Sequence, residues 1–260
     1  MAQFTSLARE LALAARNETL PRFLQGCAAD NKGGDESFDP VTEADRSAEQ
    51  AMREIISRKH PDHGISGEEF GDTPGQGVLS WSLDPVDGTR SFICGLPTWV
   101  TLAALLDGGQ PVVGLIDAPC LDEVYLGIPG ETVLDRAGTR TVLTTSGCTS
   151  LSDARLSTTD PYLFEGAQRS GFDALYSASR TVRFSHDGYA YARLAAGSLD
   201  LVVECGLKPH DYNALIPVVR GAGGVIGDWQ GSNDFSAGNI IAAATPELFD
   251  AAVAIMRHSI

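Results

Sequence analysis

The stretch "SWSLDPVDGTRSFICGLP", residues 80–97, joins an apolar strand to two aspartates and a tight turn. Asp84 and Asp87 follow the apolar residues directly, and Pro85 fixes the backbone between them. Gly88 permits a turn that a side chain would obstruct, and such a turn can direct both carboxylates at one point. Hard oxygen ligands that converge in this way suit Mg²⁺. A plain β-turn, capped by aspartate and bent by glycine, is an alternative explanation of the same residues.

The composition limits the classes of partner. The chain has 260 residues, 43% of them hydrophobic, and a net charge of −15. This length suits one large domain, or two intimate lobes, with enough core to enclose a cleft. The negative charge argues against nucleic acid or an anionic membrane as a partner. A small phosphorylated substrate stays compatible, because bound cations reverse the field inside a cleft.

The cysteines and the N-terminus bear on location. Five cysteines are scattered without a C-x-x-C pair, which argues against a disulfide framework or a zinc ribbon and favours the cytoplasm. The first twenty residues are apolar at helical spacing but contain Arg9, Glu10 and Arg16. They are typical of an amphipathic helix rather than a signal peptide. No apolar run reaches the roughly 18 residues of a membrane helix, so we expect a soluble intracellular protein.

The order of elements indicates mixed α and β structure. We expect helices over residues 3–26 and from Thr42 to about Lys59, and strands in 63–71 and 78–85. Further strands are expected in 99–119, around the Gly108-Gly109 turn, and in 122–130. After about residue 150, strands and helices alternate, and Pro246 stands in the first turn of the terminal helix. The layout predicts helices packed over sheets.

Further carboxylates occur at element ends. "GEE" places Glu68 and Glu69 after a strand, and "KPHDYNAL" places Asp211 at a helix start. "DPVTEAD" adds Asp39 and Asp45. Each has a plain explanation by itself, since a surface glutamate pair is usually solvated and an aspartate at a helix start is usually a cap.

Taken together, "GEE", "DPVDGT" and a late aspartate before a helix ending "GAGG" resemble the inositol monophosphatase family of magnesium-dependent, lithium-sensitive phosphomonoesterases. The resemblance extends from Asp39 to the final helix. It implies an α/β (α+β) layered sandwich of alternating helix and sheet layers, a homodimer, two or three Mg²⁺ ions and inhibition by Li⁺. We expect one domain over residues 1–260, with the metal motifs in a lobe of about 1–145 and the specificity residues in one of about 146–260.

The resemblance also assigns roles position by position. The metal ligands it implies are Glu68, Asp84, Asp87, Asp211 and the backbone carbonyl of Val86. Gly88 and Thr89 would hold the phosphate through backbone N–H groups at a helix start, with Asp211 also near the substrate. Thr89 and Asp45 would orient and deprotonate the attacking water, with Glu68 as a further catalytic group, and no covalent intermediate is needed. Lys32, in the glycine-rich loop, and Arg90 are further candidate contacts.

Within the family, "DGTRSFICGLP", "LKPHDYNALIPVV" and the stretch from Ser185 to Asp211 look more like the histidinol-phosphate phosphatase branch. That branch carries an aspartate at the position of Asp187, where inositol enzymes tend to have a small residue. Asp187 and Glu204 would pair with the amine and imidazole of histidinol phosphate through charge-assisted hydrogen bonds. The alternative for Asp187 is an N-cap of a helix starting at Gly188.

Three other functions remain to be weighed. An inositol-1-phosphate phosphatase, or a broad sugar-phosphate phosphatase, uses the same scaffold. A non-enzymatic regulator that retains the fold is the second. A haloacid-dehalogenase-type phosphatase is excluded, because its motif needs aspartates two residues apart and Asp84 and Asp87 are three apart. Outside the motifs, we expect His60 and His63 to face solvent and Tyr191 to be core or pocket wall.

Overall fold

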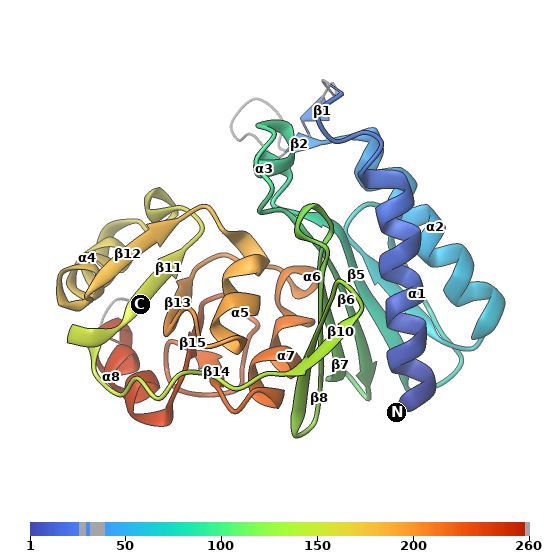
Figure 1. Cartoon of the computed structure of the whole chain (residues 1–260). Coiled ribbons are helices and arrows are strands. Elements are labelled where there is room, and N and C mark those ends of the chain that lie inside the picture. Colours follow the sequence, from blue (N-terminus) through green and yellow to red (C-terminus); the bar gives the residue numbers. More distant parts are fainter. Residues whose placement is uncertain (26–29, 32–39, 258–260) are drawn as a thin grey trace.

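Two large β-sheets, covered by helices on both faces, make up most of the fold in the computed structural model, which describes residues 1–25, 30–31 and 40–257 (Figure 1). The helices are α1 (Ala2–Thr19), α2 (Glu43–Lys59), α3 (Thr89–Ile93), α4 (Gly166–Ala178), α5 (Asp187–Ala195), α6 (Pro209–Tyr212), α7 (Leu215–Gly221) and α8 (Pro246–Met256). The strands are β1 (Asp30–Asn31), β2 (Pro40–Val41), β3 (Gly64–Gly67), β4 (Gly71–Thr73), β5 (Leu79–Asp87), β6 (Val100–Asp107), β7 (Gln110–Ala118), β8 (Glu123–Ile128), β9 (Glu131–Arg136), β10 (Thr139–Val142), β11 (Arg155–Thr158), β12 (Thr181–Phe184), β13 (Leu201–Glu204), β14 (Val225–Asp228) and β15 (Ile240–Ala243).

The larger sheet has eight strands in the order β10-β9-β8-β7-β6-β5-β3-β4, and all its pairs are antiparallel except β3 with β5. The smaller sheet has five strands in the order β12-β11-β13-β15-β14, where β11 runs parallel to both of its neighbours. β1 and β2 form a separate antiparallel pair.

Three hydrophobic cores separate the layers. One lies between α1, α2 and the larger sheet, the second between the two sheets around α5 and α7, and the third between the smaller sheet and α4 and α8. Strand β6 shows how both faces are used, because Leu102 and Ala104 enter the middle core while Ala103 and Leu105 enter the outer one. Helix and sheet layers therefore alternate, which confirms the layered α/β sandwich.

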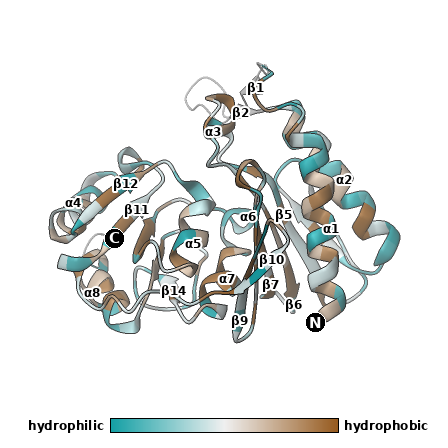
Figure 2. Cartoon of the chain, in the orientation of Figure 1, coloured by the Kyte–Doolittle hydropathy of each residue, from teal (hydrophilic) through white to brown (hydrophobic). Residues whose placement is uncertain are grey.

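The outer helices pack through one apolar face. Figure 2 shows α1 and α2 banded in hydrophilic and hydrophobic colours, as in amphipathic helices. The buried side of α1 carries Leu7, Leu11 and Ala15, which are spaced at about one helical turn. Within the described residues, no helix is long and apolar enough to cross a bilayer.

Helix α1 ends earlier than predicted. The sequence favoured a helix over residues 3–26, but α1 stops at Thr19 and turns follow to residue 25. Pro21 explains the difference, since it has no N–H to donate to the preceding turn and its ring crowds that turn. Strands β9 and β10 were not predicted, because half of the residues of β9 are charged and all of β10 is exposed.

The middle helices come very close to the larger sheet because glycines face them. A Cβ at Gly114 in β7 would lie 2.1 Å from the Ala214 carbonyl oxygen, and one at Gly127 in β8 would lie 2.4 Å from the Cα of Val218. These two positions let α7 lie directly on the strands. Helix α6, which immediately precedes α7 along the chain, is thereby held against β5.

Candidate active site

The site begins with an irregularity in β5. The strand pairs regularly with β6 as far as Asp84, opposite Leu102, and then shifts so that Asp87 lies opposite Val100. Residues three apart in a regular strand point to opposite faces. The register shift accommodates one extra residue in β5, as a β-bulge does, and the carboxylates of Asp84 and Asp87 point the same way. The strand therefore continues past the point where the sequence suggested it would end.

A third carboxylate joins these two from far along the chain. One oxygen from each of Asp84, Asp87 and Asp211 lies within 4.8 Å of the others. Asp211 stands in the first turn of α6, where its Oδ2 accepts a hydrogen bond from the backbone N–H of Lys208 at 2.7 Å. Its Oδ1 lies 3.4 Å from Nε2 of His210. Asp211 is thus not the N-cap, which is Lys208, but at N3 it accepts the N-cap N–H and also takes its predicted place in the acidic cluster.

The electrostatics of the cluster favour a cation. Burial, and then the charges of Glu68, Asp87 and Asp211, raise the pKa of Asp84 well above its usual value. Burial, followed by the Asp187 and Asp211 charges, raises the pKa of Asp87 in the same way. Like charges this close are unfavourable unless a positive ion lies between them. An all-carboxylate donor set fits a hard divalent cation such as Mg²⁺.

Glu68 approaches the cluster from the end of β3. Its backbone N–H donates to the Leu83 carbonyl at 3.2 Å, which ties it to β5. After the larger effect of burial, its charge contributes to the raised pKa of both Asp84 and Asp45, so it lies in their neighbourhood. It is not one of the three carboxylates whose oxygens lie within 4.8 Å of one another.

Glu49, in α2, holds the segment that carries Glu68 and was missed by the sequence reasoning. Its side chain is fully buried and accepts hydrogen bonds from the backbone N–H of Glu69 at 2.7 Å and of Phe70 at 3.2 Å. Arg53 donates to the same carboxylate at 2.7 Å. The signal was present, because Glu49 stands four residues after Asp45 and so lies on the same helix face.

Asp45 and Thr89 lie together, as predicted. Thr89 Oγ1 lies 3.4 Å from Asp45 Oδ1 and 3.0 Å from the Val86 carbonyl oxygen, so its proton can go to either acceptor. The other oxygen of Asp45 accepts the Thr42 N–H at 2.9 Å and closes a capping box at the start of α2. Burial raises the pKa of Asp45, although the bonds from Thr42 oppose this.

The turn after Asp87 directs the chain into α3. Gly88 is the N-cap of α3 and has φ +86°, a left-handed conformation that favours glycine. The first N–H groups of a helix have no partner within it, so those after Gly88 are available to an anion. Arg90 is exposed and lies near enough to lower the pKa of Asp187. Lys32 lies outside the described residues.

Asp187 is not the helix cap that the alternative explanation required. α5 begins at Asp187 itself, its N-cap is His186, and no side chain caps it. Asp187 instead accepts a hydrogen bond from Ser91 Oγ at 3.2 Å, and its backbone is left-handed, with φ +46°. Burial raises its pKa to about 6, against the lowering effect of Ser91. The Ser91 contact had no signal in the sequence.

The start of α5 packs directly on the turn formed by Asp87 and Gly88. The Gly188 N–H donates to Asp87 Oδ2 at 2.5 Å, across 101 residues of sequence. A Cβ at Gly188 would lie 2.6 Å from that same oxygen, and a Cβ at Gly88 would lie 2.7 Å from Asp187 Oδ2. Only two glycines allow the two segments to meet this closely.

A cavity of about 130 Å³ opens beside this contact, and its lining includes Asp87, Asp187, Tyr191, Glu204 and Asp211. Glu204, at the end of β13, is buried and accepts hydrogen bonds from the Thr159 N–H at 2.7 Å and from the Thr159 and Thr158 hydroxyls. Burial raises its pKa to about 8. A larger surface hollow of about 620 Å³ near Arg155 contains none of the acidic cluster, so volume alone does not mark the site.

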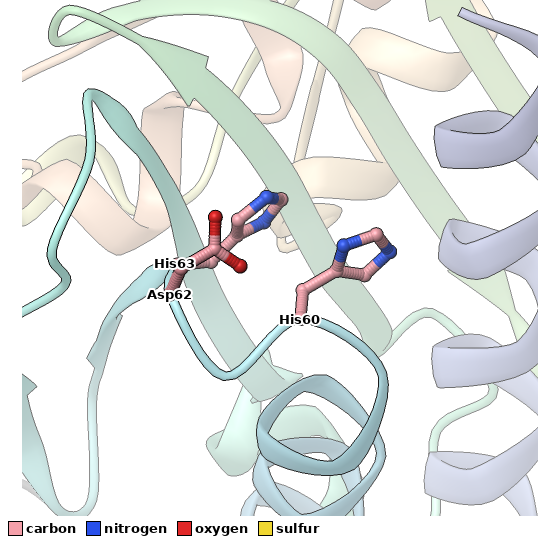
Figure 3. A group of neighbouring side chains, drawn as sticks. All are labelled: His60, Asp62 and His63. Carbon is pink, nitrogen blue, oxygen red and sulfur yellow. The ribbon is translucent and has the colours of Figure 1, made fainter.

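A second group of possible ligands, His60, Asp62 and His63, lies on the turn after α2 (Figure 3). Trp81 Nε1 donates to His63 Nδ1 at 3.2 Å, so in the neutral ring Nε2 carries the proton and no lone pair is left for a metal. His63 is 7% exposed and stacks on His60 beneath Phe4, which corrects the expectation that it faces solvent. This group packs the turn against α1.

Comparisons with known proteins find relatives among phosphatases. A model of the inositol monophosphatase family matches residues 1–260. The bifunctional phosphatase IMPL2, chloroplastic, of Arabidopsis thaliana is 44% identical over 75% of this chain, which covers 56% of that relative's length. A histidinol-phosphatase of Streptomyces coelicolor is 34% identical over 91% of each chain. The solved structure of an inositol monophosphatase from Zymomonas mobilis has a TM-score of 0.85 and 39% identity over 98% of each chain.

Proposed function

This chain belongs to the inositol monophosphatase family, and we propose that it is the phosphatase that hydrolyses histidinol phosphate to histidinol and phosphate. The observation that carries the proposal is the cavity beside the acidic cluster. Asp187 and Glu204 line it in addition to the carboxylates that a metal needs. Two further carboxylates suit a substrate whose organic part is cationic, whereas hydroxyls alone have less use for them.

The metal assignment follows from the donor set. Asp84, Asp87 and Asp211 would hold Mg²⁺ together with Glu68 and the carbonyl of Val86, with two or three ions in the working site. Mg²⁺ bound there would acidify a water molecule and stabilise the charge on the leaving oxygen. Inhibition by Li⁺ is part of the proposal.

The residues of the chain position the reactants. Thr89 donates its hydroxyl proton to Asp45 Oδ1, which leaves a lone pair of Thr89 Oγ1 to accept a hydrogen bond from the attacking water. Asp45, whose other oxygen is held by Thr42, keeps this orientation. As the attacking water passes a proton to Thr89 Oγ1, Thr89 passes its own hydroxyl proton to Asp45. The N–H groups after Gly88, with the charge of Arg90 nearby, bind the phosphate.

The organic part of the substrate lies in the cavity. Ser91 holds Asp187 beside the turn at Gly88, which is proposed to bind the phosphate. Asp187 is therefore placed for an ammonium group near the ester. Glu204 lies deeper, at the end of β13, and is placed for the imidazole. The relative named a histidinol-phosphatase supports this choice, and the Zymomonas inositol monophosphatase supports the alternative of an inositol or sugar phosphate.

The deciding experiment measures Mg²⁺-dependent phosphate release from histidinol phosphate and from inositol 1-phosphate at matched concentrations. We expect a strong preference for histidinol phosphate. In Asp187→Ala, kcat/KM for histidinol phosphate should fall about 10-fold to 100-fold, as for the loss of a charge-assisted hydrogen bond, and glycerol phosphate should change far less. Asp160 is half-buried, follows the lining residue Thr159, and accepts a hydrogen bond from the Tyr162 N–H rather than facing the cavity, so Asp160→Ala provides the control. A preference for inositol 1-phosphate, or equal losses on all substrates, would refute the proposed substrate.

Two broader expectations belong to the same proposal. The protein is proposed to be a cytoplasmic homodimer, and sedimentation of the purified chain tests the oligomer. A regulator that only retained the fold would show no metal-dependent turnover, so release of phosphate excludes it as the only role.

A further inference from the structure

Tyr191 carries a polar group that the protein itself leaves without a partner. The residue lies in α5, its side chain is 1% exposed, and its hydroxyl has no hydrogen-bond partner among the described residues. Buried hydroxyls almost always have a hydrogen-bond partner, because an unpaired one loses its hydrogen bonds to water without forming others, which costs free energy. Phenylalanine would fill the same space without this penalty, so the hydroxyl itself calls for an explanation.

The position of Tyr191 explains why it carries a hydroxyl. It follows Asp187 by four residues, which places both side chains on the same face of α5. Both line the cavity of about 130 Å³ beside the acidic cluster, as does Glu204. Burial, and then the charges of Glu204, Asp87 and Asp211, raise the pKa of Tyr191, so the phenol stays protonated.

The hydroxyl is open to a ligand. No protein group lies within hydrogen-bond distance of it among the described residues, so its lone pairs remain available to a donor that enters the cavity. Glu204 accepts hydrogen bonds from Thr158 and Thr159 and does not lie within hydrogen-bond distance of the Tyr191 hydroxyl. What complements these lone pairs, in a cavity also lined by Asp87, Asp187 and Asp211, is a cationic N–H donor.

We propose that Tyr191 is a specificity-determining residue whose hydroxyl oxygen accepts a hydrogen bond from a cationic N–H group in the organic part of the phosphomonoester. This inference rests on the proposed function, since it assumes a substrate with such a group. Together with Asp187 and Glu204, it makes the cavity a binding site for an ammonium or imidazolium head rather than for a neutral polyol.

Tyr189, on the same helix, provides a matched comparison. Its hydroxyl donates to Glu123 at 3.0 Å, and its ring packs near Tyr125 and Arg193. Tyr189→Phe removes a hydroxyl that has a partner, whereas Tyr191→Phe removes one that has none. The two changes are chemically identical and differ only in what the hydroxyl faces.

The test measures KM and kcat on histidinol phosphate and glycerol phosphate, calorimetric binding of histidinol, and the melting temperature, for both variants. In Tyr191→Phe we expect KM for histidinol phosphate and Kd for histidinol to rise about tenfold, KM for glycerol phosphate to change less than about twofold, and melting to stay or rise. Tyr189→Phe should lower the melting temperature and leave both KM values as in the wild type.

Two results would overturn the inference. One is unchanged histidinol binding in Tyr191→Phe with histidinol phosphate still hydrolysed, which leaves the proposed function intact. The other is an equal rise in KM for both substrates with a lower melting temperature, which makes Tyr191 a packing residue. If the wild type does not hydrolyse histidinol phosphate, the proposed function itself fails, and with it the cationic ligand assigned to Tyr191.

Discussion

Replacing Glu49 by glutamine tests whether Glu68, which is proposed to bind metal and take part in catalysis, depends on a residue outside the acidic cluster. Glu49 Oε2 accepts the Glu69 N–H, and Oε1 accepts the Phe70 N–H and the Arg53 side chain. Glutamine has the same shape but places an NH₂ group where one of these oxygens stood. In either orientation of the glutamine amide, its NH₂ group faces a hydrogen-bond donor: the Glu69 N–H in one, and the Phe70 N–H and the Arg53 side chain in the other.

The size of the effect follows from these contacts. The smaller loss occurs when the NH₂ group faces Glu69, which removes one hydrogen bond to a charged acceptor, worth about 1.5–3 kcal/mol. In a protein of this size the melting temperature should fall by about 3–12 °C. The Glu68 segment should also move away from its place, and a shift of about 1 Å in a catalytic group can cost about 100-fold in rate.

The assay combines thermal unfolding with phosphate release across a range of Mg²⁺ concentrations. We expect Glu49→Gln to melt lower, to turn over more slowly, and to need more Mg²⁺ for its half-maximal rate. Glu54→Gln is the control, because Glu54 is on the same helix but exposed, and among the described residues its hydrogen-bond partner is Gln50 alone. If both variants melt alike and share the wild-type Mg²⁺ dependence, Glu49 does not position Glu68.

Three further predictions address the site directly. Asp87→Asn should abolish turnover while the melting temperature stays within a few degrees, and wild-type rates would refute its assignment as a metal ligand. Gly188→Ala places a methyl group 2.6 Å from Asp87 Oδ2, so kcat should fall at least about tenfold; an unchanged kcat would mean that α5 can retreat without cost. Burial raises the pKa of Glu204 from 4.5 to about 8, so the folded protein keeps a proton that the unfolded chain releases. The contribution of Glu204 to the free energy of unfolding is full below pH 4.5 and is lost as the pH rises to 8, by at most about 1.4 kcal/mol per pH unit. In Glu204→Gln, measured without Mg²⁺, this contribution to the pH dependence should vanish. Parallel curves of stability against pH for the variant and the wild type would contradict the assignment.

Some features could be predicted because they depend on neighbouring residues. Helix α2 begins after Thr42 as expected, because its hydroxyl and the Asp45 carboxylate cap the first turn. The turn at Gly88 follows from the backbone freedom of glycine. The early end of α1 depends equally on local sequence, because Pro21 stands two residues after its last residue, Thr19. The sequence therefore contained the information that the longer predicted helix left out.

By itself, then, the sequence determined the family, the acidic motifs and the places where most elements begin, because short-range backbone chemistry decides these. The bulge that turns Asp84 and Asp87 to one side needed β6 as a pairing partner. Burial of Glu49, and of the hydroxyl of Tyr191, needed the packed layers around them. The meeting of Asp187 with the turn at Gly88 was likewise decided only in three dimensions. Long-range packing, and not local preference, sets which polar groups lose water and which partners they find.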